Sequence, residues 1–521
     1  MTASFDVIVI GGSTNGLVAA VVLARRGRKV LLVAQGAVVG GDAVPREFAP
    51  GFRVAPSALD QGWIPPGVLS ALGMAEPEII QGETAVAVHQ GGGEFFHVAS
   101  DPARAAETIR GHSARDAERW GVFTQRLGKM AGFLEALYQL PPPDIDTTSI
   151  AEIVPLIGLG RKFRALGRDD MIELLRVMPM SVQDLLDDTF ECEPLKAALA
   201  AGGVRDIQQG PRSAGTSFVL VHHLTGAPPG AVRRTARWRD GPDALVRRLE
   251  EAARAAGVTI RTSSPVARIE VRDDAVAGVV LDSGEEIQAS AVVSTLDPAR
   301  TLLGLVDPVW LDPEVLRAVA NIKLRGGRAT VLFGVEGDPG IPGDGVVSLT
   351  PSTVALERAY DAAKYGEVSP VPHVTLGVPS RHWPSLAPAG HHVVAAHVQW
   401  APFHLRAPDG WTPARREALA DTVTGAIEAA APGFAGRVRH REVMSALDLE
   451  ARYGLTEGAV THGELTLDQV LSMRPIPGFG RYRMPVSGLY LGGAGAHPGP
   501  GVLGGPAWLA AKALLADHKN K

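Results

Sequence analysis

The segment from Asp6 to Ala20 is the feature that most constrains the fold of this chain, because an apolar run leads directly into a cluster of small residues and a second apolar run. The β-branched residues of Val7 to Ile10 are typical of a buried parallel strand. Gly11 permits a sharp turn, and Gly16 permits a helix to pack closely against that strand. The segment therefore predicts a strand, a tight turn and a helix whose first N–H groups face a phosphate.

The following residues complete one βαβ unit. The helix is predicted from Gly16 to Arg26, with Gly27 as its C-terminal cap, and a second strand is predicted over Lys29 to Val33. This spacing is typical of a dinucleotide-binding domain of the α/β class. The candidate cofactor contacts in this unit are Gly11, Gly12, Ser13, Asn15, Gly16, Ala34 and Gln35, and the small-residue turn at Gly40 and Gly41 could also approach the ligand.

Two positions of the unit depart from the usual dinucleotide-binding pattern. Ser13 replaces the glycine that allows the backbone to approach the pyrophosphate. Ala34 stands where an acid normally accepts the ribose hydroxyls, and no nearby arginine or lysine could bind a 2′-phosphate. The sequence therefore leaves two interpretations open: a modified cofactor site, or an α/β module whose site is eroded or unused.

Composition excludes several classes of protein. A chain of 521 residues is long enough for two or three domains. Its net charge of −5, without a basic stripe, argues against a nucleic-acid partner. The single cysteine, Cys192, excludes a disulfide framework and any paired-thiol redox centre, and no metal-ligand spacing is present. The apolar stretch Val7 to Ala24 is interrupted by Gly11 to Asn15, and no signal peptide is visible, so we expect a cytoplasmic soluble protein.

Further along, the pattern alternates between helices and short strands. Residues 83–88 and 94–98 predict a hairpin, and residues 102–140 predict helix. Residues 149–200 also predict helix, broken at Pro155, Gly158, Gly160, Gly167 and Pro179. His222 and His223 are predicted at the end of a strand, where they would point to opposite faces and make a poor metal pair. Further strands are predicted over 258–261, 266–271, 277–281, 291–295, 329–335, 374–378 and 393–400.

A second glycine-rich segment lies near the C-terminus. Residues 488–506 predict a strand and a glycine-rich loop, and a helix follows through Leu515 with Pro506 in its first turn. A second helix N-terminus beside the first would complete a cofactor site.

These motifs identify a resemblance that covers essentially the whole chain. The sequence resembles the phytoene desaturase-like flavoprotein oxidoreductases, and it is most similar to the branch called pyridine nucleotide-disulphide oxidoreductase domain-containing protein 2. The residues that carry the resemblance are Asn15 to Ala20, Gly40-Gly41, Glu193 to Ala201, His462 to Gln469, Met473 to Gly478 and the loop of residues 488–506.

The resemblance implies FAD bound in an extended pose. The pyrophosphate would lie on Gly11 to Gly16 and the adenine near Val266, while the isoalloxazine would lie beside residues 494–502, including Ala494, Gly495, Gly501 and Val502. His497 in this loop could donate a hydrogen bond to the flavin or accept a proton, or it could only shape the loop. Positions that depart from the family pattern are Ser13, Ala34, Val38, Pro242, Ala496 and Pro500.

The resemblance also implies a fold and a function. The expected fold is an α/β Rossmann-like FAD domain, discontinuous over residues 1–75, 235–300 and 481–521, with an α+β substrate domain inserted over 76–234 and 301–480. The expected function is an FAD-dependent oxidoreductase that removes hydride from a hydrophobic or amine-type small molecule through flavin N5. Without a second dinucleotide motif, oxygen or a quinone is the simplest electron acceptor. The alternatives are a flavin-free binding or assembly protein and a redox-neutral isomerase.

One segment also suggests a membrane contact. Ile153 to Leu159 is apolar, and Arg161, Lys162, Arg164 and Arg168 follow it. Such a pattern could rest on anionic lipid at the membrane face, or it could be a core helix that ends in a solvated basic turn.

Overall fold

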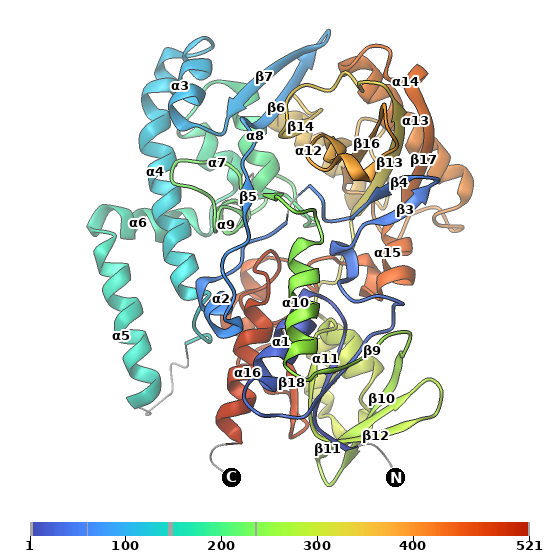
Figure 1. Cartoon of the computed structure of the whole chain (residues 1–521). Helices are drawn as coiled ribbons and strands as arrows, with labels where there is room; N and C mark the ends of the chain where they lie inside the picture. The colour runs from blue at the N-terminus through green and yellow to red at the C-terminus, as the bar shows by residue number, and fades with distance from the viewer. Residues whose placement is uncertain (1–3, 60, 144–149, 235–236, 519–521) are drawn as a thin grey trace.

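A seven-stranded sheet forms around the first strand of the chain (Figure 1). The computed structural model describes residues 4–59, 61–143, 150–234 and 237–518. The strand order is β10-β11-β12-β1-β2-β9, with β18 also paired to β12. β12, β1, β2, β9 and β18 run parallel, and β10 and β11 form an antiparallel edge. The bounds are β1 (Ser4–Ile10), β2 (Val30–Val33), β9 (Thr259–Arg261), β10 (Val266–Arg272), β11 (Ala275–Leu281), β12 (Glu286–Ser294) and β18 (Leu489–Leu491).

The helix of the first βαβ unit is buried on all sides. α1 (Thr14–Ala24) contacts α10 (Ala244–Ala255) and α16 (Gly505–Asp517), which explains why its sequence is apolar all round rather than on one stripe. It begins two residues earlier than the predicted start at Gly16, with Ser13 as its N-cap. The first sheet, these helices, α2 (Pro66–Leu72) and α11 (Pro313–Ala320) share one apolar core.

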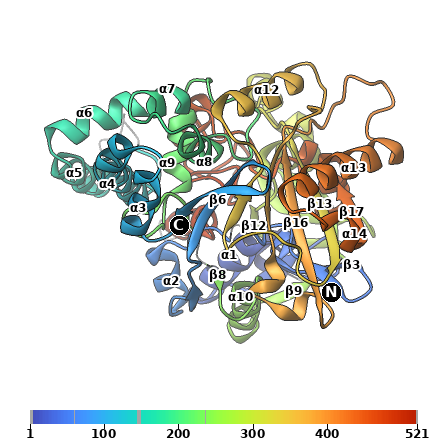
Figure 2. The same ribbon diagram turned by 90° about the horizontal axis from the view of Figure 1, so that it is seen from above.

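A second seven-stranded sheet lies at the other end of the molecule, in the order β17-β13-β16-β15-β14-β6-β7. Figure 2 shows it beside a group of helices when the molecule is seen from above. Its strands are β6 (Thr84–Gly91), β7 (Glu94–Ala99), β13 (Arg328–Glu336), β14 (Val346–Ser348), β15 (His373–Gly377), β16 (His391–Gln399) and β17 (Val438–Met444). The helices that follow its strands are α12 (Thr353–Lys364), α13 (Pro413–Ala430), α14 (Phe434–Arg437) and α15 (Ala446–Tyr453).

The remaining helices gather on one side of the second sheet. α5 extends away from the others and is seen at the left of Figure 1. In the part of the chain that the structure describes, no helix is both long and apolar enough to cross a bilayer. The bounds are α3 (Pro102–Arg110), α4 (Ala114–Leu137), α5 (Ile150–Ala165), α6 (Arg168–Val177), α7 (Val182–Asp187), α8 (Glu193–Gly203) and α9 (Thr216–His223).

The discontinuous α/β architecture predicted from the sequence is confirmed, since three distant segments contribute strands to the first sheet. Two segments pack against the sheet of the other domain than the one to which the sequence assigned them. Residues 302–319 pack into the core of the first sheet. The hairpin of β3 (Arg46–Ala49) and β4 (Phe52–Val54) packs instead on the second sheet. A short two-stranded pair, β5 (Ile79–Ile80) with β8 (Arg237–Trp238), also joins distant segments.

Two local predictions were wrong. His222 and His223 end the helix α9 rather than a strand. The apolar run before them is fully buried, and a short buried run has no periodicity that separates strand from helix. α5 is continuous through Pro155, Gly158 and Gly160, where breaks were predicted. A glycine in a helix costs only about 1 kcal/mol relative to alanine, which contacts with α4 and α6 can offset. The predicted breaks at Gly167 and Pro179 are confirmed.

Candidate functional site

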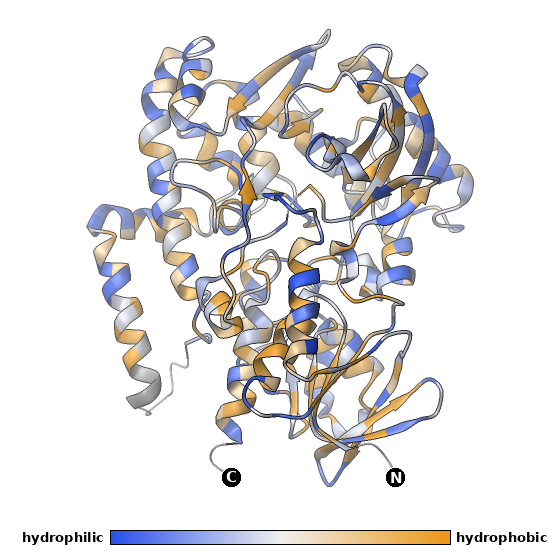
Figure 3. Ribbon diagram, viewed as in Figure 1, coloured by the Kyte–Doolittle hydropathy of each residue, from blue (hydrophilic) through white to orange (hydrophobic). Residues whose placement is uncertain are grey.

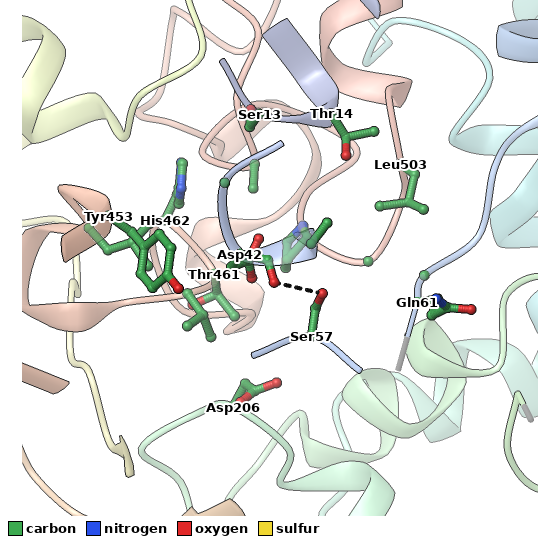
Figure 4. A pocket seen from close by; sticks show the side chains of 18 of the residues that line it. Ser13, Thr14, Asp42, Ser57, Gln61, Asp206, Tyr453, Thr461, His462 and Leu503 are labelled. Carbon is green, nitrogen blue, oxygen red and sulfur yellow. Dashed lines mark hydrogen bonds between the residues drawn. The ribbon is translucent and has the colours of Figure 1, made fainter. Parts of the chain in front are cut away.

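A cavity of about 600 Å³ lies where the two sheets and the helical part meet. The glycine-rich turn after β1 and the loop before α16 line one side of it, and β13, β15 and β16 line another. Figure 4 shows Ser13 and Thr14 on one side of this space and Asp206 on the opposite side. The cavity therefore brings together both predicted glycine-rich segments and residues of the second sheet.

Three positions of the first turn require glycine, because neighbouring atoms leave no room for a Cβ. Gly11 has a φ of +106°, and a Cβ there would lie 2.4 Å from Thr295 Oγ1. A Cβ on Gly12 would lie 2.7 Å from the Cβ of Ala34, and one on Gly16 would lie 1.9 Å from the Gly11 carbonyl oxygen. Side chains therefore cannot be added to these positions without moving the backbone, and the turn keeps the close strand–helix packing that the sequence predicted.

The N-terminus of α1 opens into the cavity without a cap. Ser13 is the N-cap, yet its side chain makes no capping hydrogen bond, and the first turn of α1 contains no acidic residue. The first N–H groups of a helix lack partners within the helix and carry partial positive charge. Ser13, Thr14 and Asn15 line the cavity. This arrangement fits a bound pyrophosphate.

The loop before α16 is held against the first turn. The Gly504 N–H donates to Asn15 Oδ1 at 3.1 Å. Trp63 fixes the loop from another side, because its N–H donates to the Gly501 carbonyl at 2.8 Å and its carbonyl accepts from the Leu503 N–H at 2.7 Å. The two helix N-termini are therefore neighbours, as the sequence predicted.

The position expected to bind ribose has an unusual environment. Ala34 is buried beside Gly12 at the end of β2, and the Gln35 amide oxygen accepts from Arg300 Nη2 at 3.0 Å. Val38 lines the same side of the cavity and is 63% exposed. The side that would hold the ribose is therefore formed by an amide–guanidinium pair and small residues, and sequence analysis missed Arg300 because it lies far along the chain.

Some of the predicted cofactor contacts lie behind the cavity lining. Gly16, Gly40, Gly495 and Val266 are not among the described residues that line the cavity. The Gly40 N–H donates to the Gly12 carbonyl at 2.6 Å, so Gly40 supports the turn from behind. Gly495 packs against Pro298, and Val266 begins β10. Lining residues that match the sequence prediction are Gly11, Gly12, Ser13, Asn15, Ala34, Gln35, Gly41, Ala494, Gly501 and Val502.

His497 is buried behind the glycine-rich loop. Its ring packs edge-on against Tyr138, with the centroids 5.8 Å apart, and burial lowers its pKa to about 4. The Tyr138 hydroxyl is 2.7 Å from His222 Nδ1, while His222 Nε2 is 2.9 Å from the Pro500 carbonyl oxygen. Because the Pro500 oxygen is an acceptor, His222 donates there and accepts from Tyr138. This chain of contacts supports the loop from outside the cavity lining.

A polar floor faces the cavity from the second sheet. Alternate residues of one strand point to the same face, so His373 and Thr375 of β15 lie together, as do His397 and Gln399 of β16. The sequence predicted these two strands, but it did not identify their polar residues as part of the site. Two polar residues spaced by two within an otherwise apolar strand were the available signal. Of the neighbouring pair at the end of α9, His223 is among the described residues that line the cavity and His222 is not.

Two half-buried acids, Asp206 and Asp42, lie in this region. Asp206 Oδ1 accepts from Arg328 Nη1 at 3.2 Å. Burial raises the pKa of Asp42, against the opposing effect of the Arg328 guanidinium. The Asp42 carbonyl also accepts from Ser57 Oγ at 3.1 Å, the interaction drawn in Figure 4.

Comparisons with known proteins agree with this geometry. Residues 161–402 match the family described as flavin containing amine oxidoreductase, and residues 6–50 match FAD dependent oxidoreductase. Phytoene dehydrogenase of Streptomyces griseus is 28% identical over 74% of this chain and 71% of its own length. The crystal structure of an oxidoreductase from Methanosarcina mazei has a TM-score of 0.62 at 18% identity, covering 98% of this chain and all of that one, which shows the same fold.

Several relatives match nearly the whole chain. The pyridine nucleotide-disulfide oxidoreductase domain-containing protein 2 of Rattus norvegicus is 30% identical over 555 residues, which cover 99% of this chain and 94% of the relative. FAD is the cofactor that these matches support, and the open N-terminus of α1 fits its pyrophosphate. The chain therefore belongs to the family of pyridine nucleotide-disulfide oxidoreductase domain-containing protein 2, within the phytoene desaturase-like FAD-dependent oxidoreductases.

Proposed function

We propose that this chain oxidises a small molecule held in the cavity between the glycine-rich turns and the floor of the second sheet. When bound, FAD supplies a hydride acceptor. The observation that carries the proposal is the uncapped N-terminus of α1, which opens into the same cavity as the polar floor. The first turn of α1 would hold the pyrophosphate, Gln35 with Arg300 would lie at the ribose, and Gly501 and Val502 would lie at the reactive end.

Paired-thiol chemistry is not part of this proposal, although a relative's name mentions disulfide. The chain contains one cysteine, and Cys192 is buried at the start of α8, where burial raises the pKa of its thiol. A thiol with a raised pKa is a poor nucleophile at neutral pH. Oxygen or a quinone stays the proposed electron acceptor.

The type of substrate and the role of His497 are less directly supported than oxidation by FAD. A hydrophobic or amine-type substrate stays a prediction. His497 also stays a prediction as a residue that acts on the flavin. Its place behind the loop favours a positioning role, because its contacts run to Tyr138 rather than into the cavity.

Flavin binding is the decisive test. We expect the purified protein, saturated with FAD and washed, to release flavin on denaturation, as measured by absorbance. Combining Ala34→Glu with Ser13→Gly should tighten FAD binding by about ten- to a hundredfold, because a carboxylate acceptor for the ribose hydroxyls contributes roughly 1.5–3 kcal/mol. Gln288→Glu is the matched control, since it adds the same charge at an exposed position of β12 away from the cavity, and it should leave the affinity unchanged.

The alternatives predict different results. A flavin-free binding or assembly protein would release no flavin and would gain binding only in the double variant. A redox-neutral isomerase would bind FAD yet give the same product with and without oxygen. Tight wild-type binding together with oxygen consumption would support the oxidoreductase over both.

We also propose that α5 contacts an anionic membrane surface. Val154 and Ile157 are 60% and 51% exposed, and the basic residues Arg161 and Lys162 follow on the same helix. Figure 3 shows apolar residues along this outlying helix. The side chains of Ile153 and Pro155 lie outside the described residues.

Sedimentation with vesicles tests this contact. Vesicles containing phosphatidylserine should bind the protein at low salt and release it at high salt, because basic contacts contribute about 1 kcal/mol each and are screened. Reversing Arg161 and Lys162 to glutamate should abolish sedimentation, whereas Arg268→Glu and Arg272→Glu at exposed positions of β10 should not. Wild-type protein that stays in the supernatant at low salt would contradict the proposal.

A further inference from the structure

His462 lines the cavity, but it has no role in the function proposed above. It begins residues 462–469, one of the segments that carry the family resemblance. Figure 4 shows its side chain among those of the cavity wall. Its backbone has a φ of +52°, in the left-handed region that residues other than glycine rarely adopt. Such a conformation persists only where surrounding contacts impose it, and it is often found at functional sites.

One buried guanidinium holds the backbone on both sides of His462. Arg474 Nη2 donates to the carbonyl of Thr461 at 2.5 Å and to that of Gly463 at 3.2 Å. The same nitrogen donates to the Ala494 carbonyl at 2.7 Å, and Ala494 also lines the cavity. His462 is therefore held beside the loop at which the proposed function places the reactive end of the flavin.

The Nδ1 atom of the His462 ring is left without a partner inside the protein. It is buried and has no hydrogen-bond partner in the described part of the chain. Asp297 lies near the ring, but its carboxylate already accepts from Thr456 Oγ1 at 2.8 Å and from the Arg300 backbone N–H at 2.8 Å. Buried polar atoms in native proteins are normally paired, so this exception in a cavity wall indicates a ring that serves a ligand.

The unpaired Nδ1 determines which ring nitrogen carries the proton. Burial lowers the pKa of His462, Asp297 acts against this effect and Arg474 adds to it, so the ring is neutral at pH 7.5. A neutral imidazole has one N–H, and a buried N–H without an acceptor is less well tolerated than a buried lone pair. The proton therefore belongs on Nε2. Because the ring lines the cavity, Nε2 is a donor available to a ligand there.

We propose that His462 donates a hydrogen bond from Nε2 to the flavin ring at the reactive end of the cavity. This inference rests on the proposed function, because it adds a residue that contacts the cofactor in the same site. A reduced flavin ring carries more negative charge than an oxidised one, and hydrogen bonds to the ring are a means by which a protein tunes it. A hydrogen bond to a charged acceptor is roughly twice as strong as one to a neutral acceptor. His462 would therefore favour the reduced flavin and raise its reduction potential.

Two substitutions of similar length test the donor. Methionine and glutamine reach about as far as each other, but only glutamine donates a hydrogen bond. In the FAD-loaded protein, we expect His462→Met to lower the two-electron reduction potential by about 30 mV, which corresponds to a tenfold loss of affinity for reduced relative to oxidised flavin. His462→Gln should lie closer to the wild-type potential than His462→Met. Reductive titration beside a reference dye, followed by absorbance, measures the potentials.

A third variant and a control complete the series. His462→Asn suits the left-handed backbone and is too short to reach the position of Nε2, so it should reproduce the shift of His462→Met. His89→Met is the matched control. His89 on β6 is also half-buried and also has an unpaired ring nitrogen, Nε2, in the described part of the chain, but it is not among the described residues that line the cavity. Its substitution should leave the flavin potential unchanged.

The outcomes separate this inference from the proposed function. A purely structural role of His462 would weaken the binding of oxidised and reduced flavin equally, so bound flavin with an unchanged potential in His462→Met and His462→Asn would overturn the inference alone. An equal shift in His89→Met would also overturn it. A wild-type protein that binds no flavin would overturn the proposed function and the inference together. If His462→Met does not fold, the comparison of His462→Asn with the wild-type protein decides.

Discussion

Replacing Arg474 by methionine is expected to lower the free energy of unfolding by roughly 3–5 kcal/mol. Arg474 is buried, and in the described part of the chain its side chain forms no hydrogen bond with an acidic side chain. Its guanidinium is buried and donates only to backbone carbonyls. Burial lowers its pKa to about 10, so it is still charged at neutral pH. The carbonyls that accept from it belong to Thr461, Gly463, Glu464, Gln469 and Ala494.

The cause of the large effect is the number of acceptors that one side chain satisfies. Methionine fills much of the same volume and donates nothing, so several buried carbonyls would lose their partner at once. Arg474→Lys should also destabilise, because an ammonium cannot reproduce the planar fork. Since Ala494 lines the cavity, the same change should weaken FAD binding by loosening the loop.

Chemical denaturation at pH 7.5 measures this prediction. The matched control is Arg268→Met on β10, where an exposed arginine pairs with Glu270, and its effect should lie within about 0.5 kcal/mol. A loss of less than about 1 kcal/mol in Arg474→Met would show that the loops of residues 461–474 and 494 are held by other contacts.

The first strand, turn and helix could be predicted because neighbouring residues in the sequence determine them. Val7 to Ile10, Gly11 and Gly16 specify a strand, a turn and a close-packed helix through their own backbone requirements, and the structure contains all three. The strands over 266–281 were predicted for the same reason.

The floor of the cavity could not be predicted in this way. Arg328 meets Asp206 across more than a hundred residues, and His397 becomes a site residue only because β16 lies beside β13 and β15. His222 was misplaced because its helix is buried on all sides and has lost the helical period. Positions that depend on which distant strands are neighbours have no signature in a single sequence.

Lowering the pH from 7.5 to 5.5 is expected to destabilise the protein by about 4–6 kcal/mol through four buried histidines. Burial lowers the pKa of His222 and His397 to about 3, and that of His373 and His497 to about 4, from an ordinary value of 6.5. Below pH 6.5 the unfolded chain binds protons at these rings while the folded protein does not. Stability is therefore greatest above pH 6.5 and falls as the pH falls toward 4.

Buried acids act on the pH dependence in the opposite direction to these histidines. Burial raises the pKa of Asp42 and Glu464 from ordinary values of 3.8 and 4.5, and such groups favour the folded state as the pH falls. The four histidines act together over the whole window from pH 7.5 to 5.5, whereas each of these acids opposes them only at pH values below its own raised pKa. Each neutral histidine contributes about 1.4 kcal/mol per pH unit below 6.5, and the total scales with the number of buried rings.

Denaturant unfolding across this pH range measures the slope, and single variants assign it. His373→Gln should reduce the loss of stability over this window by about 1.4 kcal/mol, because its ring is buried in the floor beside Thr350 and Thr375. His404→Gln is the matched control, since the side chain of His404 is 77% exposed and solvated in both states, and it should leave the slope unchanged. A wild-type stability that is constant between pH 7.5 and 5.5 would mean that these rings take up protons in the folded protein. The cavity floor would then be more open to water than its packing indicates.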